Sequence, residues 1–270
     1  MSVPADGELV RLAIRVRASA AEAALARLLP LMPGGAEERL AGDAVEYALY
    51  GAAGELPDEA ALRALAGDAL LGVSRAPVAG GWETAWHAHL PRVEAGGFAI
   101  RPPWVAGAPD DVVIEPGLTF GAAAHPTTRL CLELLRGQTP LSGGAADWGC
   151  GSGVLAICAA RAGFEPVLAV DVDPAAVALT RENARANGVE VEARRLDVTK
   201  ARPPYAPTVV ANLTLPLLRA LAALPGPPPR TLIASGVLAG QADAVVAAWG
   251  MRERERRVQD GWAALRLEAA

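Results

Sequence analysis

Apolar and polar residues follow two different rhythms along this chain, and the change of rhythm divides it into two parts. In the first part, alternating apolar and basic side chains predict a strand at 9–16, and an Ala- and Leu-rich stretch predicts a helix at 20–29. The further elements expected there are strands at 37–40 and 44–50, a helix at 58–66 and a strand at 70–77. The resulting β-α-β-β-α-β order predicts a small ferredoxin-like domain over residues 1–79.

Residues 80–92 are predicted to connect the two parts. Two glycines precede a short helical stretch in which Trp82 and Trp86 stand one turn apart. Indole rings at that spacing pack against a folded domain. We therefore expect a packed connector helix at 82–90.

From Phe98 onward, strands and helices alternate, which predicts a doubly wound, mainly parallel sheet. The expected helices are at 130–135, 154–162, 175–187, 215–224 and 241–249. The expected strands are at 145–147, 166–170, 191–196, 208–211 and 231–235, with a closing antiparallel hairpin at 252–258 and 262–267. The predicted fold class is therefore α/β, a Rossmann-like sheet over residues 93–270 preceded by a small α+β domain.

One turn of this predicted sheet contains residues that are candidates for binding a cofactor. After the strand that ends at Asp147, glycines occupy alternate positions, at Gly149, Gly151 and Gly153, and a helix follows. Glycines at such a turn let a ligand approach the backbone and let the helix pack on the sheet. Asp171 ends the next strand roughly 20 residues further on, where an acidic side chain can hold ribose hydroxyls. The pattern predicts a site for an adenosine-containing cofactor, the alternative being that the glycines only shape the turn.

The spacing of the glycines distinguishes two kinds of cofactor. A dinucleotide site has the order G-x-G-x-x-G, which seats a pyrophosphate on the helix N-terminus. Here an acidic residue precedes alternate glycines, and an anionic Asp147 disfavours a pyrophosphate and suits a cationic ligand. S-adenosyl-L-methionine combines adenosine with a sulfonium and carries no phosphate. We therefore expect S-adenosyl-L-methionine as the cofactor.

Composition and charge exclude several other classes of protein. With 270 residues, of which 52% are hydrophobic, the chain can bury the cores of two domains. A net charge of −5 offers no broad basic surface, so sequence-specific nucleic-acid binding is not expected. Its three cysteines lack metal-ligand spacing, which predicts reduced thiols and no metal site. We find no signal-peptide or membrane-spanning pattern, and we expect a cytoplasmic monomer with no membrane partner.

Several segments together resemble the bacterial ribosomal protein L11 methyltransferases, the PrmA family. The segments are Glu115-Pro-Gly-Leu-Thr-Phe-Gly, His125-Pro-Thr-Thr128, Asp147 to Gly153, Val170-Asp-Val-Asp-Pro174, Val210-Ala-Asn212-Leu and Ser235-Gly-Val-Leu. The glycine turn and Asp171 are common to methyltransferases in general, whereas the first, second and fifth segments are more restricted. One position departs from the family, which usually has Gly-Thr-Gly-x-His where this chain has Gly121-Ala-Ala-Ala-His125. That change removes a glycine and a hydroxyl close to the expected cofactor.

The resemblance implies an enzyme that moves methyl groups from S-adenosylmethionine to lysine side chains, the N-terminal amine or both, with ribosomal protein L11 as substrate. It implies that residues 1–79 recognise the substrate. It also implies cofactor contacts at Thr128, Gly149, Asp171 and Asn212, to which the turn adds Gly151, and it places Asn212 beside the transferred methyl as the catalytic residue.

Each of these side chains also has a plainer interpretation. Thr128 could cap a helix. Asp171 could do the same for the following helix, although Asp173 before Pro174 is better placed. Asn212 could satisfy loop backbone groups.

Two further residues also have both a functional and a structural interpretation. Asp197 could bind the adenine amino group or could be a turn aspartate. His125 could be a general base or could only hold its loop.

Three alternative functions remain open from the sequence. The chain could methylate lysines of another protein, such as the β-subunit of electron-transfer flavoprotein. A small-molecule substrate is disfavoured, because a separate recognition domain suits a macromolecule. The chain could also be a non-catalytic cofactor-binding module, although its glycines and Asp171 are intact.

Overall fold

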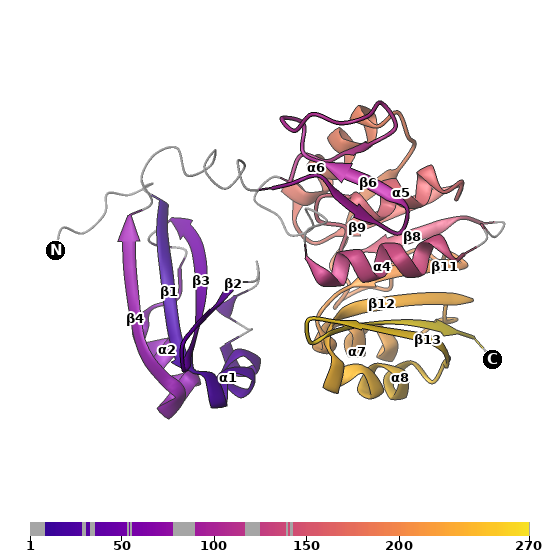
Figure 1. Ribbon diagram of the computed structural model, residues 1–270. Helices are drawn as coiled ribbons and strands as arrows, with labels where there is room; N and C mark the ends of the chain where they lie inside the picture. Colours follow the sequence, from indigo (N-terminus) through magenta and orange to yellow (C-terminus); the bar gives the residue numbers. More distant parts are fainter. Residues whose placement is uncertain are drawn as a thin grey trace. The chain divides into compact units, whose positions relative to one another are not determined.

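The computed structural model describes residues 9–28, 31–32, 36–52, 54, 56–77, 90–116, 125–138, 140 and 143–269 (Figure 1). The chain forms two compact units, residues 1–88 and 89–270, which are described separately. Their boundary falls within the segment predicted as a connector. The predicted helix of that segment, with Trp82 and Trp86, lies outside the described residues apart from its last position, Leu90, which belongs to no helix.

The smaller unit is one antiparallel sheet with two helices. Its elements are β1 (Leu9–Arg17), η1 (Ala18–Ala20), α1 (Ala21–Leu28), β2 (Glu37–Ala41), β3 (Ala44–Ala52), α2 (Glu59–Ala66), η3 (Gly67–Ala69) and β4 (Leu70–Pro77). The strand order is β2-β3-β1-β4, which is the split β-α-β arrangement of ferredoxin-like domains. Alternate residues of β1, such as Leu12 and Ile14, are fully buried in a cluster with Leu28, Tyr47 and Leu62. The alternation along β1 arises from this one-sided burial.

The larger unit is built on a seven-stranded mixed sheet. Its strands are β8 (Ala145–Trp148), β9 (Val167–Asp171), β10 (Glu192–Arg195), β11 (Thr208–Asn212), β12 (Thr231–Leu238), β13 (Arg252–Gln259) and β14 (Trp262–Glu268). Its helices are α4 (Pro126–Arg136), α5 (Val154–Arg161), α6 (Pro174–Ala186), α7 (Leu215–Ala223), η5 (Ala239–Gln241) and α8 (Ala242–Trp249). The doubly wound α/β architecture predicted from the sequence is confirmed.

The order of the strands places a reversal of winding at the middle of this sheet. The order is β10-β9-β8-β11-β12-β14-β13, with β8 to β12 parallel and β14 antiparallel to both of its neighbours. From β8 the chain winds outward through β9 and β10, then crosses back to β11 and winds the other way. Ligands of open parallel sheets bind outside the carboxyl ends of the strands at such a reversal. We therefore expect the binding site at the carboxyl ends of β8, β9 and β11.

The closing hairpin explains the alternating charges of residues 252–257. β13 is the outer strand of the sheet, and its arginines pair with carboxylates on several elements. Arg256 Nη2 lies 2.6 Å from Asp243 Oδ1 of α8, and Arg257 Nη1 lies 2.8 Å from Glu133 Oε2 of α4. Charged side chains along an outer strand also discourage it from pairing with another chain.

A small sheet that the sequence pattern did not predict precedes the main one. It consists of β5 (Val93–Ala95), β6 (Phe98–Arg101) and β7 (Val112–Val113). Its first turn has positive φ at Gly96 and Gly97, and a Cβ on Gly96 would lie 2.2 Å from the Leu132 carbonyl oxygen of α4. The strands are too short for a periodic signal, so their pairing with one another and the contact of their first turn with α4 define them.

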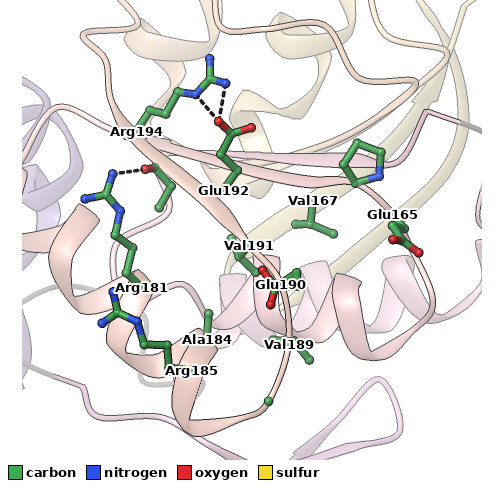
Figure 2. A pocket seen from close by; sticks show the side chains of 13 residues that line it. Glu165, Val167, Arg181, Ala184, Arg185, Val189, Glu190, Val191, Glu192 and Arg194 are labelled. Carbon is green, nitrogen blue, oxygen red and sulfur yellow. Dashed lines mark hydrogen bonds and ion pairs between the residues drawn. The ribbon is translucent and has the colours of Figure 1, made fainter.

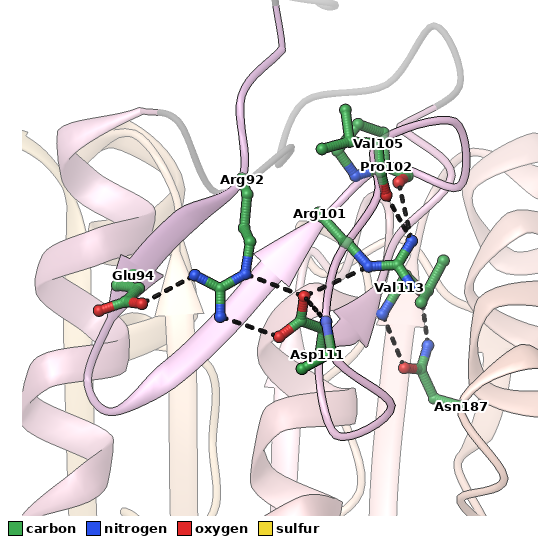
Figure 3. Close-up of polar contacts among 9 residues, drawn as sticks. Arg92, Glu94, Arg101, Pro102, Val105, Asp111, Val113 and Asn187 are labelled. Carbon is green, nitrogen blue, oxygen red and sulfur yellow. Dashed lines mark hydrogen bonds and ion pairs between the residues drawn. The ribbon is translucent and has the colours of Figure 1, made fainter.

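A buried carboxylate holds this small sheet together (Figure 3). The Asp111 side chain is 1% exposed, and its two oxygens accept hydrogen bonds of 2.9 and 3.0 Å from Arg92 Nε and Nη2. Arg101 Nε lies 3.3 Å from the same carboxylate. The hydrogen bonds from Arg92 lower the pKa of Asp111. Residues 90–92 therefore belong to the fold of the larger unit.

Candidate active site

Three strand ends converge at the reversal point of the sheet. Asp147 of β8 stands opposite Ala169 of β9 and Val210 of β11 in the parallel register. Two residues beyond these partners, β9 ends at Asp171 and β11 ends at Asn212. The sheet therefore brings the glycine turn, Asp171 and Asn212 to one edge, although they are far apart in the sequence.

The glycine turn after β8 fits tightly against the loop after β11. Gly149, Gly151 and Gly153 have φ angles of +82°, +53° and +81°. The Gly149 N–H donates to the Val170 carbonyl at 2.8 Å, and a Cβ on Gly149 would lie 2.5 Å from Leu213 Cδ2. A side chain is thus excluded at Gly149 both by backbone conformation and by lack of space.

Asp171 joins β9 to this turn. Its Oδ2 accepts a 3.0 Å hydrogen bond from the Gly151 N–H, and its Oδ1 accepts one of 3.0 Å from the Asp173 N–H. Asp173 is the residue that caps α6, because its Oδ1 accepts a 2.8 Å hydrogen bond from the Ala175 N–H. The prediction that Asp173 and not Asp171 serves as the helix cap is confirmed.

Asp147 is the most deeply buried carboxyl of this edge. Asp147 is 1% exposed, and its Oδ2 accepts a 3.1 Å hydrogen bond from the Ala156 N–H of α5. Oδ1 is buried and has no hydrogen-bond partner within the described part of the chain. Burial raises the pKa of Asp147 to about 7. The expectation of a fully anionic carboxylate therefore needs correction, because full ionisation at neutral pH requires a cation beside it.

A chain of hydrogen bonds fixes the orientation of Asn212. Its Nδ2 donates to Thr127 Oγ1 at 3.1 Å and lies 3.4 Å from Thr128 Oγ1. Thr127 Oγ1 is 2.7 Å from His125 Nδ1, and the Thr127 N–H points at the same nitrogen at 3.3 Å. His125 Nδ1 is therefore the acceptor, so the Thr127 hydroxyl donates to it and accepts from Asn212. The Asn212 Oδ1 atom is left buried, with no partner in the described structure.

His125 and not Thr128 caps α4. Its imidazole accepts from the Thr127 N–H and stacks edge-on against Trp262, with ring centroids 5.0 Å apart. Burial lowers the pKa of His125. Thr128 is 1% exposed on the first turn of the helix, so the interpretation of Thr128 as a cap is wrong. A neutral His125 engaged at Nδ1 favours the interpretation that this residue holds its loop.

Asp197 lies two residues beyond β10 and is engaged locally. Its Oδ1 accepts from the Thr199 N–H at 3.0 Å and from Thr199 Oγ1 at 2.6 Å, while Oδ2 lies 2.8 Å from Lys200 Nζ. The bond from Lys200 and those from Thr199 lower the pKa of Asp197 to about 2. These contacts favour the interpretation of Asp197 as a turn aspartate.

Two features of the site were not singled out from the sequence. Thr127 lies in the His-Pro-Thr-Thr segment, but its contacts with both Asn212 and His125 depend on the pairing of distant elements. Asn183 of α6 contacts the glycine turn from behind, with its Nδ2 2.8 Å from the Ser152 carbonyl oxygen. A repeated Asn at positions 183 and 187 was the only available signal.

A surface groove elsewhere on this unit is not the candidate site. It is lined by the beginning of β9, by β10 and by α6, including Val167, Arg181 and Glu192 (Figure 2). Val167 is at the opposite end of β9 from Asp171, so the groove lies away from the convergent strand ends. In the described part of the chain no cluster of side chains suits a metal ion, and none of its helices is long and apolar enough to cross a membrane.

The sequence matches the family described as ribosomal protein L11 methyltransferase (PrmA) over residues 75–269. The chain belongs to this family. A relative named ribosomal protein L11 methyltransferase, from Pectobacterium carotovorum subsp. carotovorum (strain PC1), is 38% identical over 233 residues, which cover 81% of this chain and 77% of the relative. One of the same name from Serratia proteamaculans (strain 568) is 40% identical over 178 residues, covering 62% and 60% of the two chains. The resemblance read from the motifs is thereby confirmed.

A solved structure supports the fold of this PrmA-family chain. It is a ribosomal protein L11 methylase from Lactobacillus delbrueckii subsp. bulgaricus, with a TM-score of 0.57 and 23% sequence identity. The alignment covers 67% of this chain and 97% of that structure. The predicted Rossmann-like methyltransferase sheet is confirmed.

The environment of Asp147 predicts a pH-dependent cost to stability. The pKa rises from 3.8 to about 7 on folding, so ionisation of Asp147 opposes the fold. The cost is absent below about pH 4 and complete above about pH 7. Asp147→Asn should therefore raise the free energy of unfolding of the cofactor-free protein at pH 8, by up to about 4 kcal/mol. Urea unfolding at pH 5 and pH 8 measures this gain, which should shrink at pH 5.

The exposed carboxyl of Asp110 provides the control. Asp110→Asn should leave the free energy of unfolding nearly unchanged at both pH values. Equal stability of the Asp147→Asn variant and the wild type at pH 8 would contradict the burial argument.

Proposed function

We propose that this chain transfers methyl groups from S-adenosyl-L-methionine to lysine side-chain and N-terminal amines of ribosomal protein L11. The family match over residues 75–269 is the observation that carries this proposal. The position of the glycine turn, at the reversal point of the sheet, agrees with it. A cytoplasmic location follows from such a substrate and is part of the proposal.

The strand ends offer suitable groups for this cofactor. Asp171 has acceptor capacity beyond its two backbone hydrogen bonds, which suits ribose hydroxyls. Oδ1 of Asp147 has no partner among the described residues and suits a cationic part of the cofactor, which would also favour the ionised carboxylate. We propose that the backbone of Gly149 and Gly151 and the hydroxyl of Thr128 complete the binding site.

Asn212 has the geometry of a group that orients the incoming amine. Thr127 holds its Nδ2, which leaves Oδ1 as a buried acceptor without a partner in the described residues. We propose that this oxygen accepts a hydrogen bond from the substrate nitrogen. A neutral nitrogen can then direct its lone pair at the methyl carbon.

The reaction is an in-line displacement in which an N–C bond forms as the C–S bond breaks. The sulfur keeps the bonding electron pair, and the nitrogen finally loses a proton. A free lysine has a pKa of about 10.4, so loss of solvent around it must favour the neutral amine. His125 Nδ1 is occupied by Thr127, and we propose that water takes the proton. Catalysis then depends on positioning and desolvation.

We further propose that the two units divide the work. The larger unit holds every cofactor group named above, and the smaller unit, residues 1–79 in the sequence-based division, would recognise the protein substrate. The two relatives described above are both named for ribosomal protein L11. Their names favour this substrate over another lysine-containing protein and favour an enzyme over a non-catalytic module.

A labelling experiment tests the proposed reaction. The purified chain should transfer labelled methyl from S-adenosylmethionine to purified ribosomal protein L11. Asp171→Ala should reduce cofactor affinity by about tenfold or more, because charge-assisted hydrogen bonds are each worth about 1.5–3 kcal/mol. Label on another protein of a cell lysate, with none on L11, would redirect the proposal to that target.

The second test separates the role of Asn212 from cofactor binding. Asn212→Ala removes the amine acceptor and leaves the contacts of Gly149 and Asp171 in place. We expect single-turnover rates at saturating cofactor to fall by roughly tenfold or more, with a smaller change in cofactor affinity. Asn212→Asp keeps an acceptor oxygen and serves as the matched variant. An unimpaired rate for Asn212→Ala would make this residue a loop-stabilising group.

The third test concerns the division between units. A fragment of residues 90–270 retains Arg92, the partner of buried Asp111. It should bind S-adenosylmethionine as the full chain does but methylate L11 at least about tenfold more slowly, since remote binding energy is lost. A thermal melt checks that the fragment is folded. Equal rates on L11 for the fragment and the full chain would remove the recognition role from the first unit.

A further inference from the structure

Helix α6 and the residue that caps its C-terminus present a stripe of buried polar side chains to the backbone of two neighbouring segments. Thr180, Asn183 and Asn187 follow one another at helical spacing, and each is 7% exposed or less. Thr180 Oγ1 donates to the Gly151 carbonyl at 3.1 Å, within the glycine turn. The two asparagines reach the segment that runs from Val113 to Glu115.

Asn183 is the member of the stripe that joins the two segments. Its Nδ2 donates to the Ser152 carbonyl at 2.8 Å and to the Glu115 carbonyl at 2.9 Å. Its Oδ1 accepts from the Glu115 N–H at 2.9 Å. The amide thus pairs with both backbone groups of Glu115, as a neighbouring strand would, while it holds the glycine turn with its second proton.

Asn187 makes the same kind of contact without reaching the turn (Figure 3). Its Oδ1 accepts from the Val113 N–H at 2.9 Å, and its Nδ2 donates to the Val113 carbonyl at 2.6 Å. Nδ2 also donates to the Asn183 carbonyl of α6 at 2.7 Å. Both asparagines are therefore buried and fully engaged, but only Asn183 touches the glycine turn.

We infer that Asn183 is a positioning residue for the cofactor, acting through the Ser152 carbonyl. In the same turn the Gly153 N–H donates to the Cys150 carbonyl at 2.8 Å. Together with Asp171 on the Gly151 N–H and Thr180 on the Gly151 carbonyl, Asn183 fixes the peptide planes of the turn before the cofactor arrives. A preorganised turn loses less conformational freedom on binding, so its rigidity contributes to affinity. The inference rests on the proposed function only in its choice of ligand.

A matched pair of variants separates positioning from stability. Asn183→Ala and Asn187→Ala each remove one buried amide that pairs with main-chain groups of the 113–115 segment, and both should lower Tm. We expect the Kd for S-adenosylmethionine, measured by calorimetry on the full chain, to rise by about tenfold for Asn183→Ala. For Asn187→Ala it should stay within about twofold of the wild type. Equal changes in Kd for the two variants, or no change in either, would overturn the inference.

A third variant covers the case in which Asn183→Ala does not fold. Asn183→Asp keeps the shape of the side chain and an acceptor for the Glu115 N–H, but a carboxylate cannot donate to the two carbonyls. Its affinity for S-adenosylmethionine should be weak at pH 8 and should recover relative to the wild type as the pH falls, because a protonated carboxyl can donate one hydrogen bond. A constant ratio of affinities across pH would contradict the inference.

Measuring binding and turnover separately keeps this inference distinct from the proposed function. A wild-type chain that does not bind S-adenosylmethionine would refute the proposed function itself. A wild type that binds, together with an Asn183→Ala variant that binds equally well, would refute only the role of Asn183.

Discussion

The close approach of three backbone segments around Leu213 is the constraint on which the candidate site depends. A Cβ on Gly149 would lie 2.5 Å from the Leu213 side chain, and one on Gly236 would lie 2.5 Å from the Leu213 carbonyl oxygen. The Leu213 N–H donates to the Ser235 carbonyl at 3.0 Å. Leu213 is thus enclosed between the end of β8 and residues 235–236 of β12, and this fixes the end of β11 at Asn212. Without glycines at 149 and 236 the strand ends could not meet so closely.

Two buried hydrogen-bond acceptors at this edge of the sheet lower the stability of the fold. Asp147 Oδ1 and Asn212 Oδ1 have no hydrogen-bond partner among the residues that the structure describes. An unsatisfied buried polar group costs about 1–3 kcal/mol, and more if it is charged. The two oxygens belong to β8 and β11, on either side of the reversal of the sheet. A ligand that is cationic near Asp147 and a donor near Asn212 would compensate both costs, and the proposed sulfonium cofactor and amine substrate have these properties.

The polar contacts around the site share one principle, because side chains complete the hydrogen bonding of backbone groups in neighbouring segments. His125 holds the start of α4, Asp171 holds the glycine turn, and Asn183 and Asn187 hold the 113–115 segment. Such contacts satisfy backbone groups that are not paired within a strand ladder or a helix. The site is therefore built on rigid supports before any ligand is bound, which is the condition for catalysis by positioning.

The sequence by itself determined the long elements, the α/β class and the glycine turn after β8. Their signals are local: helical and strand periodicity, alternate glycines, and an acidic residue at the end of the next strand. It did not predict the β5-β6-β7 sheet, whose two-residue strand β7 is defined by its partners. It also did not predict the cap at His125, which depends on the imidazole folding over the first turn of the helix that follows it. The tertiary structure alone decided that Thr127 meets Asn212 and that burial raises the pKa of Asp147 to about 7. Contacts between residues 85 positions apart, and the loss of solvent around a side chain, exist only once the sheet has closed.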